Sequence, residues 1–256
     1  MNTFRRLSRR GALLFGGLLL CGHTIAVQAD DYGSISGQVV YDGSAPDAKI
    51  LIKKGDAAAK DSAVCAAADL PDEGLVIDAE TMGIANVFVY LEKAPAKIHP
   101  DMKKASEAEV VFDQKNCRFL PHALIVRADQ GVRVKSDDPI SHNTHLGGIY
   151  NSENKTIAAN DRTGVLFKIK AERQPIPVKC DIHSFMVANW LILPHGYAAV
   201  TDAKGNFSID KLPAGKHEFR IWHEKVGYIE RKYSVTVKAG DETKLDVVKV
   251  APSKFK

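Results

Sequence analysis

Aromatic side chains are few in this chain of 256 residues, and glycine and proline are not enriched. Phenylalanine, tryptophan and tyrosine make up 7% of the sequence, which argues against the rows of stacked rings that hold single-stranded nucleic acid. The 19 glycines and 11 prolines exclude a collagen-like or low-complexity chain. Apolar residues account for 45% and charged residues for 26%, so we expect one large globular domain or two small ones.

Net charge is also missing from most of the chain. The formal charge of +4 lies wholly in residues 1–29, which hold four arginines and no acidic residue. Residues 30–256 therefore sum to zero. A protein that binds a phosphate backbone needs an excess of lysine and arginine, so we expect no nucleic-acid partner.

Residues 1–29 have the pattern of an export signal. A basic head precedes an apolar run over 12–27, and the small-residue site Val27-Gln28-Ala29 stands before Asp30. The run is short and broken by glycines, so we predict cleavage, a periplasmic location and no stable membrane span afterwards; a retained anchor is the alternative. Residues 8–14 (SRRGALL) resemble a twin-arginine signal, although Ala12 stands where a bulky apolar residue is usual. The Sec and Tat routes both stay open.

Only three cysteines remain after cleavage: Cys65, Cys117 and Cys180. Exported proteins tend to pair their thiols, and three is an odd number. We therefore expect one disulfide and one thiol kept for another use. The count does not say which cysteine stays unpaired.

Most of the remaining chain has the alternation and the turn pairs that are typical of β-strands. This spacing predicts an all-β fold built from sandwiches or barrels. An alanine-rich patch at 57–68 predicts a short helix, residues 97–109 a linker and residues 251–256 a frayed basic tail. The expected strands cover residues 34–41, 86–91, 123–127, 132–135, 165–169, 190–193, 207–209, 217–222 and 233–237.

One short segment gathers metal donors. Cys180 is followed by His183 at +3 and Met186 at +6, and His142 and His145 lie upstream. One thiolate, two imidazoles and one thioether form the donor set of mononuclear electron-transfer copper, whereas zinc prefers a carboxylate to a thioether. Because neighbouring positions on a strand alternate between faces, we expect only one of His142 and His145 to point at the metal.

Residues 107–194 resemble the cupredoxins, the small blue-copper proteins of the amicyanin and plastocyanin types. The resemblance rests on EVVFDQKNCRFLPHALIVRADQGVRVKSDDPISHNTH and on the loop CDIHSFM. It implies a Greek-key β-sandwich over residues 104–194 and one type 1 copper ion. It also implies the ligands: His142 as the first imidazole, Cys180 as the thiolate, His183 as the second imidazole and Met186 as the axial thioether.

The same resemblance implies supporting roles. Asn143 matches a position that buttresses the thiolate loop, and His183 matches the exposed histidine that serves as the electron port. With Cys180 on the metal, Cys65 and Cys117 are free to pair, and we predict a disulfide between them. The sequence departs from the pattern at Val178, where an aromatic is frequent, and at Ser184, where amicyanins carry proline.

The two ends of the mature chain resemble halves of another unit. Residues 33–95, which begin GSISGQVVYDG, and residues 196–248, with TDAKGNF and LPAG, are similar to the carboxypeptidase-regulatory or transthyretin-like β-sandwich. The resemblance implies a second, small sandwich made of residues 30–96 and 195–250, with the copper domain at 104–194 inserted between them.

These observations predict an exported electron carrier that is not an enzyme, because all four metal positions are filled and none is left for a substrate. The expected partners are periplasmic redox proteins such as a c-type cytochrome or a dehydrogenase. One alternative is a periplasmic or cell-surface binding module in which copper is structural or stored. Another is a copper-delivery protein.

Overall fold

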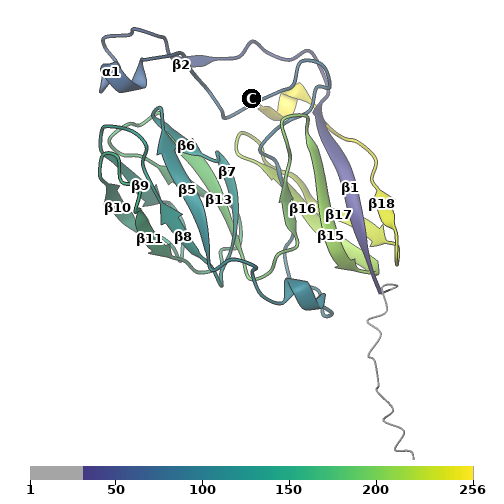
Figure 1. Cartoon of the computed structure of the whole chain (residues 1–256). Coiled ribbons are helices and arrows are strands. Elements are labelled where there is room, and N and C mark those ends of the chain that lie inside the picture. The colour runs from purple at the N-terminus through teal and green to yellow at the C-terminus, as the bar shows by residue number, and fades with distance from the viewer. Residues whose placement is uncertain (1–30, 256) are drawn as a thin grey trace, which may run out of the picture.

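The computed structural model describes residues 31–255, and the predicted export signal at 1–29 lies outside them. The all-β class is confirmed: the described chain is built from strands, with one short α-helix and short 3-10 turns (Figure 1). The strands form two sandwiches that lie side by side, with a long connecting segment over one of them. No helix within residues 31–255 has the length and apolar character needed to cross a membrane.

The first sandwich, here called the split sandwich, is made from the two ends of the described chain. One sheet has the order β15–β1–β18, with β19 also on β1, and the other has the order β14–β4–β16–β17. Its core contains alternate residues of β1, such as Ile35 and Val39, which meet Phe219 and Ile221 of β16. Its strands are β1 (Tyr32–Tyr41), β4 (Phe88–Leu91), β14 (Ala198–Val200), β15 (Asn206–Pro213), β16 (Gly215–His223), β17 (Gly227–Val237), β18 (Glu242–Lys244) and β19 (Val248–Val250).

The second sandwich, here called the inserted sandwich, is made from the middle of the chain. Its sheets have the orders β10–β9–β12–β13–β7 and β11–β8–β5–β6. The ring of Trp190 fills its core, edge-on to Phe112 and Phe167. Its strands are β5 (Glu109–Lys115), β6 (Arg118–Leu120), β7 (Ala123–Arg127), β8 (Gly131–Val134), β9 (His142–Leu146), β10 (Asn154–Ile157), β11 (Val165–Lys168), β12 (Ile176–Lys179) and β13 (Val187–Leu193).

The inserted sandwich leaves and rejoins the split sandwich at neighbouring strands. β4 precedes it and β14 follows it, and these strands pair antiparallel, with Tyr90 opposite Ala198. The amide of Leu91 donates to the carbonyl of Tyr197 at 3.1 Å. Because the two ends of the insertion lie next to each other, the strands of the split sandwich pair as they would in a continuous domain. The turn η2 (Pro100–Met102) lies in the connection that was expected to be a linker.

The two sandwiches share a small core of their own. In β13, Trp190 and Ile192 face the inserted core, whereas Leu191 and Leu193 face Phe88 and Tyr90 of the split sandwich. Because residues on a strand alternate between faces, a strand that reads as a continuous apolar run is buried on both sides. The run at 190–193 is such a strand, so the two sandwiches are packed against each other through it.

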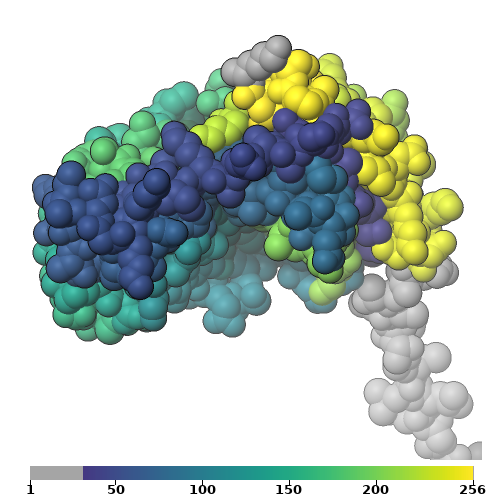
Figure 2. Space-filling model, turned by 90° about the horizontal axis from the view of Figure 1, so that it is seen from above, coloured from purple at the N-terminus to yellow at the C-terminus, as the bar shows by residue number. Residues whose placement is uncertain are grey.

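Residues 50–71 cross over the inserted sandwich, and we call them the cap segment. They hold β2 (Ile50–Ile52), α1 (Ser62–Cys65) and β3 (Leu70–Pro71), with α1 inside the predicted helical patch. Although sequence places them in the split sandwich, Ile52 and Leu70 are buried in the core of the inserted sandwich. Figure 2 shows this segment, in dark blue, lying across the inserted unit.

A disulfide joins the cap segment to the sandwich beneath it. The predicted Cys65–Cys117 bond is present, with 5.3 Å between the two Cα atoms. It links the end of α1 to the turn between β5 and β6. Residues 50–71 are therefore held to the inserted sandwich by a covalent bond as well as by their buried side chains.

The expected frayed tail is wrong for the part of it that the structure describes. Residues Pro252–Phe255 form the 3-10 turn η3, and directly before the expected tail Val248–Val250 forms β19, which pairs parallel with β1. The ring of Phe255 packs at 5.3 Å from that of Tyr41. Sequence analysis did not predict β19, because its partner strand lies about two hundred residues earlier in the chain.

Candidate metal centre

His142 is the first residue of β9, and its ring is completely buried. Its Nε2 lies 2.9 Å from Oδ2 of Asp138, and its Nδ1 lies 3.0 Å from Nδ1 of His183. Burial alone would lower the pKa of His142, but the hydrogen bonds to Asp138 and Cys180 outweigh it and raise that pKa to about 9. The first imidazole is thus oriented from behind by a carboxylate and faces the second imidazole.

Asp138 is held in turn by the tight turn between β5 and β6. That turn consists of Asn116 and Cys117, both in the left-handed region with φ of 53° and 54°. Positive φ at both central residues is typical of the type I′ turns that join two antiparallel strands. Their amides donate to the Asp138 carboxylate at 2.6 and 2.9 Å. Burial acts to raise the pKa of Asp138, but the hydrogen bonds from His142 and from these amides keep it below its ordinary value.

Cys180 directly follows β12 and is a free, buried thiol. The amides of Asn143 and His183 donate to its Sγ at 3.5 and 3.4 Å, and Nδ1 of His183 lies 3.8 Å from the sulfur. Burial acts to raise the pKa of Cys180, whereas the hydrogen bond with His142 and the amide donors lower it, and the net shift is downward. This environment favours the thiolate, which is the form that binds metals.

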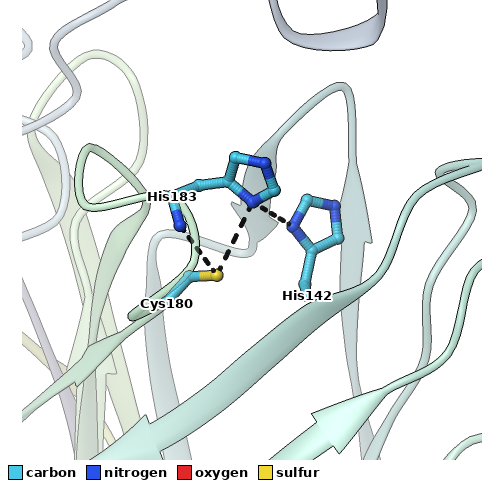
Figure 3. Close-up of side chains that lie close together, drawn as sticks. All are labelled: His142, Cys180 and His183. Carbon is cyan, nitrogen blue, oxygen red and sulfur yellow. Dashed lines mark hydrogen bonds between the residues drawn. The ribbon is translucent and has the colours of Figure 1, made fainter. Parts of the chain in front are cut away.

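His183 lies on the loop after β12 and faces both other donors (Figure 3). The resemblance implied that it is an exposed electron port, and this is wrong: only 1% of its surface is exposed. The reason is the cap segment, whose Asp61 accepts a hydrogen bond from Nε2 of His183 at 2.8 Å. Burial lowers the pKa of His183, and the hydrogen bond to Asp61 opposes that shift without cancelling it.

Met186 ends the same loop and is buried in the inserted core. Its amide donates to the carbonyl of His183 at 2.9 Å, and its carbonyl accepts from the amide of Cys180 at 3.2 Å. These two bonds close the loop between β12 and β13. Met186 therefore closes the donor loop through its backbone, and its side chain is buried.

Asn143 braces the loop from β9. Its Oδ1 accepts from the amides of Asp181 and Ile182 at 2.7 and 3.2 Å, which is the kind of contact that the resemblance implied. His145, the rival first ligand, lies elsewhere: 43% of its side chain is exposed, and its Nδ1 contacts the carboxylate of Asp181 at 3.1 Å. The alternation along β9 thus directs His142, and not His145, to the buried cluster.

The chemistry and spacing of these donors fit a single metal ion. The ligand atoms of His142, Cys180 and His183 all lie within 4.8 Å of one another. Imidazole nitrogens and thiolate sulfurs bind metals such as zinc at about 2.0–2.3 Å, so donors that share one ion lie about 3–4 Å apart, as the 3.0 and 3.8 Å separations do. Thiolate, thioether and imidazole together are a copper set.

Sequence reasoning missed the two carboxylates behind the imidazoles. Asp138 stands four residues before His142, in the run Asp137-Asp138-Pro139, and that nearness was a usable signal. Asp61 is 122 residues from His183 in the chain and carries no local signal. It reaches the site only because the cap segment packs on the inserted sandwich.

No family model matches this chain, and no curated protein matches it. Among solved structures, it is similar to a reduced mutant of amicyanin, with 15% identity over 35% of this chain and 86% of that chain, at a TM-score of 0.28. It is also similar to a purple cupredoxin from Nitrosopumilus maritimus, with 17% identity over 34% of this chain and 99% of that one, at a TM-score of 0.27. A copper-containing nitrite reductase from Thermus scotoductus SA-01 matches at 15% identity and a TM-score of 0.27, over 33% of this chain and 22% of its own. TM-scores this low carry no weight for activity, so the case for the site rests on its own geometry.

Proposed function

We propose that this chain is an exported electron carrier that binds one copper ion in the inserted sandwich. His142 and His183, through Nδ1, and Cys180, through Sγ, would hold the ion, with Met186 as the axial donor. The observation that carries the proposal is the convergence of two imidazoles and one thiolate within 4.8 Å of one another, in a site closed to solvent. Bound copper supplies a one-electron couple between Cu(I) and Cu(II).

The residues around the donors support rapid one-electron exchange. Each donor is fixed by hydrogen bonds that do not depend on the metal: two amides on the Cys180 sulfur and one carboxylate on each imidazole. Donors that are already in place move little when the charge of the site changes. With Met186 as a fourth donor, four side chains would fill the metal positions and leave none for a substrate, and on that ground we propose that the protein is not an enzyme.

The visible spectrum of the copper-loaded protein tests this proposal. We expect an intense blue colour in the oxidised protein that bleaches reversibly on reduction. The Cys180→Ser variant should lose the colour, whereas His145→Ala should keep it because His145 lies outside the cluster. A wild-type protein that stays colourless after copper titration would refute the assignment.

The partner and the compartment are part of the same proposal. The apolar run and small-residue site in residues 1–29 support export to the periplasm. A redox protein such as a c-type cytochrome or a dehydrogenase is the corresponding partner. Loss of the first 29 residues from the protein recovered from the periplasmic fraction, seen by intact mass, would support this location.

A second candidate is favoured by the burial of His183. The cap segment closes the face at which a redox partner would contact that imidazole, and such closure suits a structural or storage copper, or one that is delivered to an acceptor. Stopped-flow oxidation by hexacyanoferrate separates the two. A carrier exchanges electrons within milliseconds and keeps its copper, whereas a storage or delivery protein exchanges slowly or releases Cu(I) to a chelator.

A further inference from the structure

Both imidazoles of the donor cluster have a carboxylate on the nitrogen that faces away from the cluster. Nε2 of His142 is 2.9 Å from Asp138, and Nε2 of His183 is 2.8 Å from Asp61. An ionised carboxylate only accepts hydrogen bonds, so each Nε2 carries the hydrogen. The two Nδ1 atoms face each other at 3.0 Å, a distance at which one of them donates a hydrogen to the lone pair of the other; a bound metal ion would take the place of that hydrogen.

Asp61 occupies a backbone position that the cap segment builds for it. It precedes α1 and has φ of 52° and ψ of 44°, a left-handed conformation that is uncommon for a residue other than glycine. Its carbonyl accepts from the amides of Val64 and Cys65, both at 2.9 Å. The start of α1 therefore fixes Asp61 relative to Cys65, and residues held in this way often cluster at functional sites.

One disulfide connects the supports of both carboxylates. Cys65 ends the helix that fixes Asp61, and the amide of Cys117 donates to Asp138 at 2.9 Å. The Cys65–Cys117 bond joins these two residues directly. A shift of either half of the bridge therefore acts on one of the two imidazoles.

We propose that Asp61 and Asp138 are positioning residues for the copper site, and that the Cys65–Cys117 bridge holds both of them in place. This inference rests on the proposed function for the identity of the ion. Each carboxylate fixes the tautomer and the ring orientation of one imidazole, so that both Nδ1 atoms are ready as ligands. Carboxylates behind ligating histidines also raise the basicity of the ring, which favours Cu(II) over Cu(I).

An ordinary surface ion pair between Asp61 and His183 is the competing explanation. The Asp61 side chain is 39% exposed, but the side chain of His183 is fully buried. A surface pair that forms only because two side chains are near each other leaves the site unchanged when it is broken. The proposal requires the opposite, because Nε2 of His183 would lose the acceptor that sets its tautomer.

The central test is Asp61→Ala in the metal-free protein, with Asp56→Ala as the matched control from the same segment. Long-range proton–nitrogen correlation spectra report which ring nitrogen carries the hydrogen. We expect a slowly exchanging Nε2–H of His183 in the wild type and in Asp56→Ala, and its loss in Asp61→Ala. Asp61→Asn should keep the signal because the amide oxygen still accepts. An unchanged His183 signal in Asp61→Ala would overturn the proposal.

Copper binding gives the second measurement. We expect Asp61→Ala to lower the affinity for Cu(II) by about 10- to 100-fold, with Asp61→Asn between it and the wild type. A tenfold loss confined to Cu(II) raises the reduction potential by about 59 mV. Equal affinities and potentials in all three proteins would reject the positioning role. A wild type that binds no copper would instead reject the proposed function, and the nuclear magnetic resonance result would still decide the role of Asp61.

The role of the bridge is tested by the double variant Cys65→Ser/Cys117→Ser. We expect it to reproduce the loss of the His183 Nε2–H signal and to weaken the corresponding signal of His142. In a Trp222→Phe background, the emission of Trp190, buried in the inserted core, shows whether that sandwich is still folded. A folded double variant with both signals intact would show that the bridge does not hold the carboxylates. Where the double variant does not fold, Asp138→Ala tests the His142 half: we expect loss of the His142 Nε2–H signal and a lower Cu(II) affinity, and retention of both would overturn the proposal.

Discussion

Removal of the Cys65–Cys117 bridge should destabilise the inserted sandwich by several kcal/mol. The bridge closes a loop with a sequence separation of 52 residues, and the chain-entropy relation for a loop of that length gives about 4 kcal/mol at 25 °C. The loss falls on the inserted sandwich because the bridge ties the cap segment to the turn between β5 and β6. The side chains of Ile52 and Leu70 in the core keep some of the cap segment in place.

Urea unfolding of the metal-free protein measures this loss. The chain has two tryptophans, Trp190 in the inserted core and Trp222 on β16, so Trp222→Phe leaves an emission signal from the inserted sandwich alone. In that background, Cys65→Ser/Cys117→Ser should lower the unfolding midpoint and raise the slope, because the unfolded chain becomes less compact. A loss below about 1 kcal/mol would refute the reasoning that the bridge restrains the unfolded chain.

Three further predictions concern the donor loop, the split sandwich and the tail. Asn143→Ala leaves the amides of Asp181 and Ile182 without their acceptor and should cost about 2–3 kcal/mol in urea unfolding, so an unchanged unfolding midpoint would contradict the bracing role. Burial lowers the pKa of His195 to about 4, whereas its pKa in the unfolded chain has the ordinary value near 6.5. Between these two values the unfolded chain binds more protons than the folded chain. The contribution of His195 to the free energy of unfolding is therefore complete above pH 6.5 and is lost as the pH falls toward 4, by at most about 3 kcal/mol. Unfolding midpoints between pH 7 and 4.5 should fall less steeply in His195→Gln than in the wild type, with the rest of the slope left to His223, whose burial also lowers its pKa to about 4; a slope equal to that of the wild type would contradict this account. Phe255→Ala removes the contact with Tyr41 and should lower the stability of the split sandwich by about 1–2 kcal/mol, whereas a freely frayed tail would make it neutral.

The sequence predicts those features that depend on nearby residues. The period-two pattern around 190–193 and 207–209 indicates strands, because every second side chain meets a core. The donor loop from Cys180 to Met186 is equally local: its three donors are three residues apart, and a tight turn brings them to one side. We predicted the pairing of Cys65 with Cys117 because the resemblance to cupredoxins assigns Cys180, the third thiol, to the metal.

The features that sequence reasoning missed depend on distant contacts. The stretch 53–61 (KKGDAAAKD) of the cap segment has no regular spacing of apolar residues, so its sequence does not predict which of the two cores the segment packs against. Its placement comes from Ile52, Leu70 and the disulfide. The burial of His183 follows from that placement, which is why the exposed port implied by resemblance is wrong. The strand β19 was missed for the same reason, since it forms only on β1.

The cap segment over His183 has a consequence for the maturation of the protein. Under the proposed function, an ion that arrives after the Cys65–Cys117 bond has formed would have to pass the cap segment to reach His183, whereas an ion that arrives earlier would meet three reduced thiols. The order in which the Cys65–Cys117 bond forms and the ion arrives would therefore matter. Under the proposed function, the order of these two events would decide how much of the protein carries its ion.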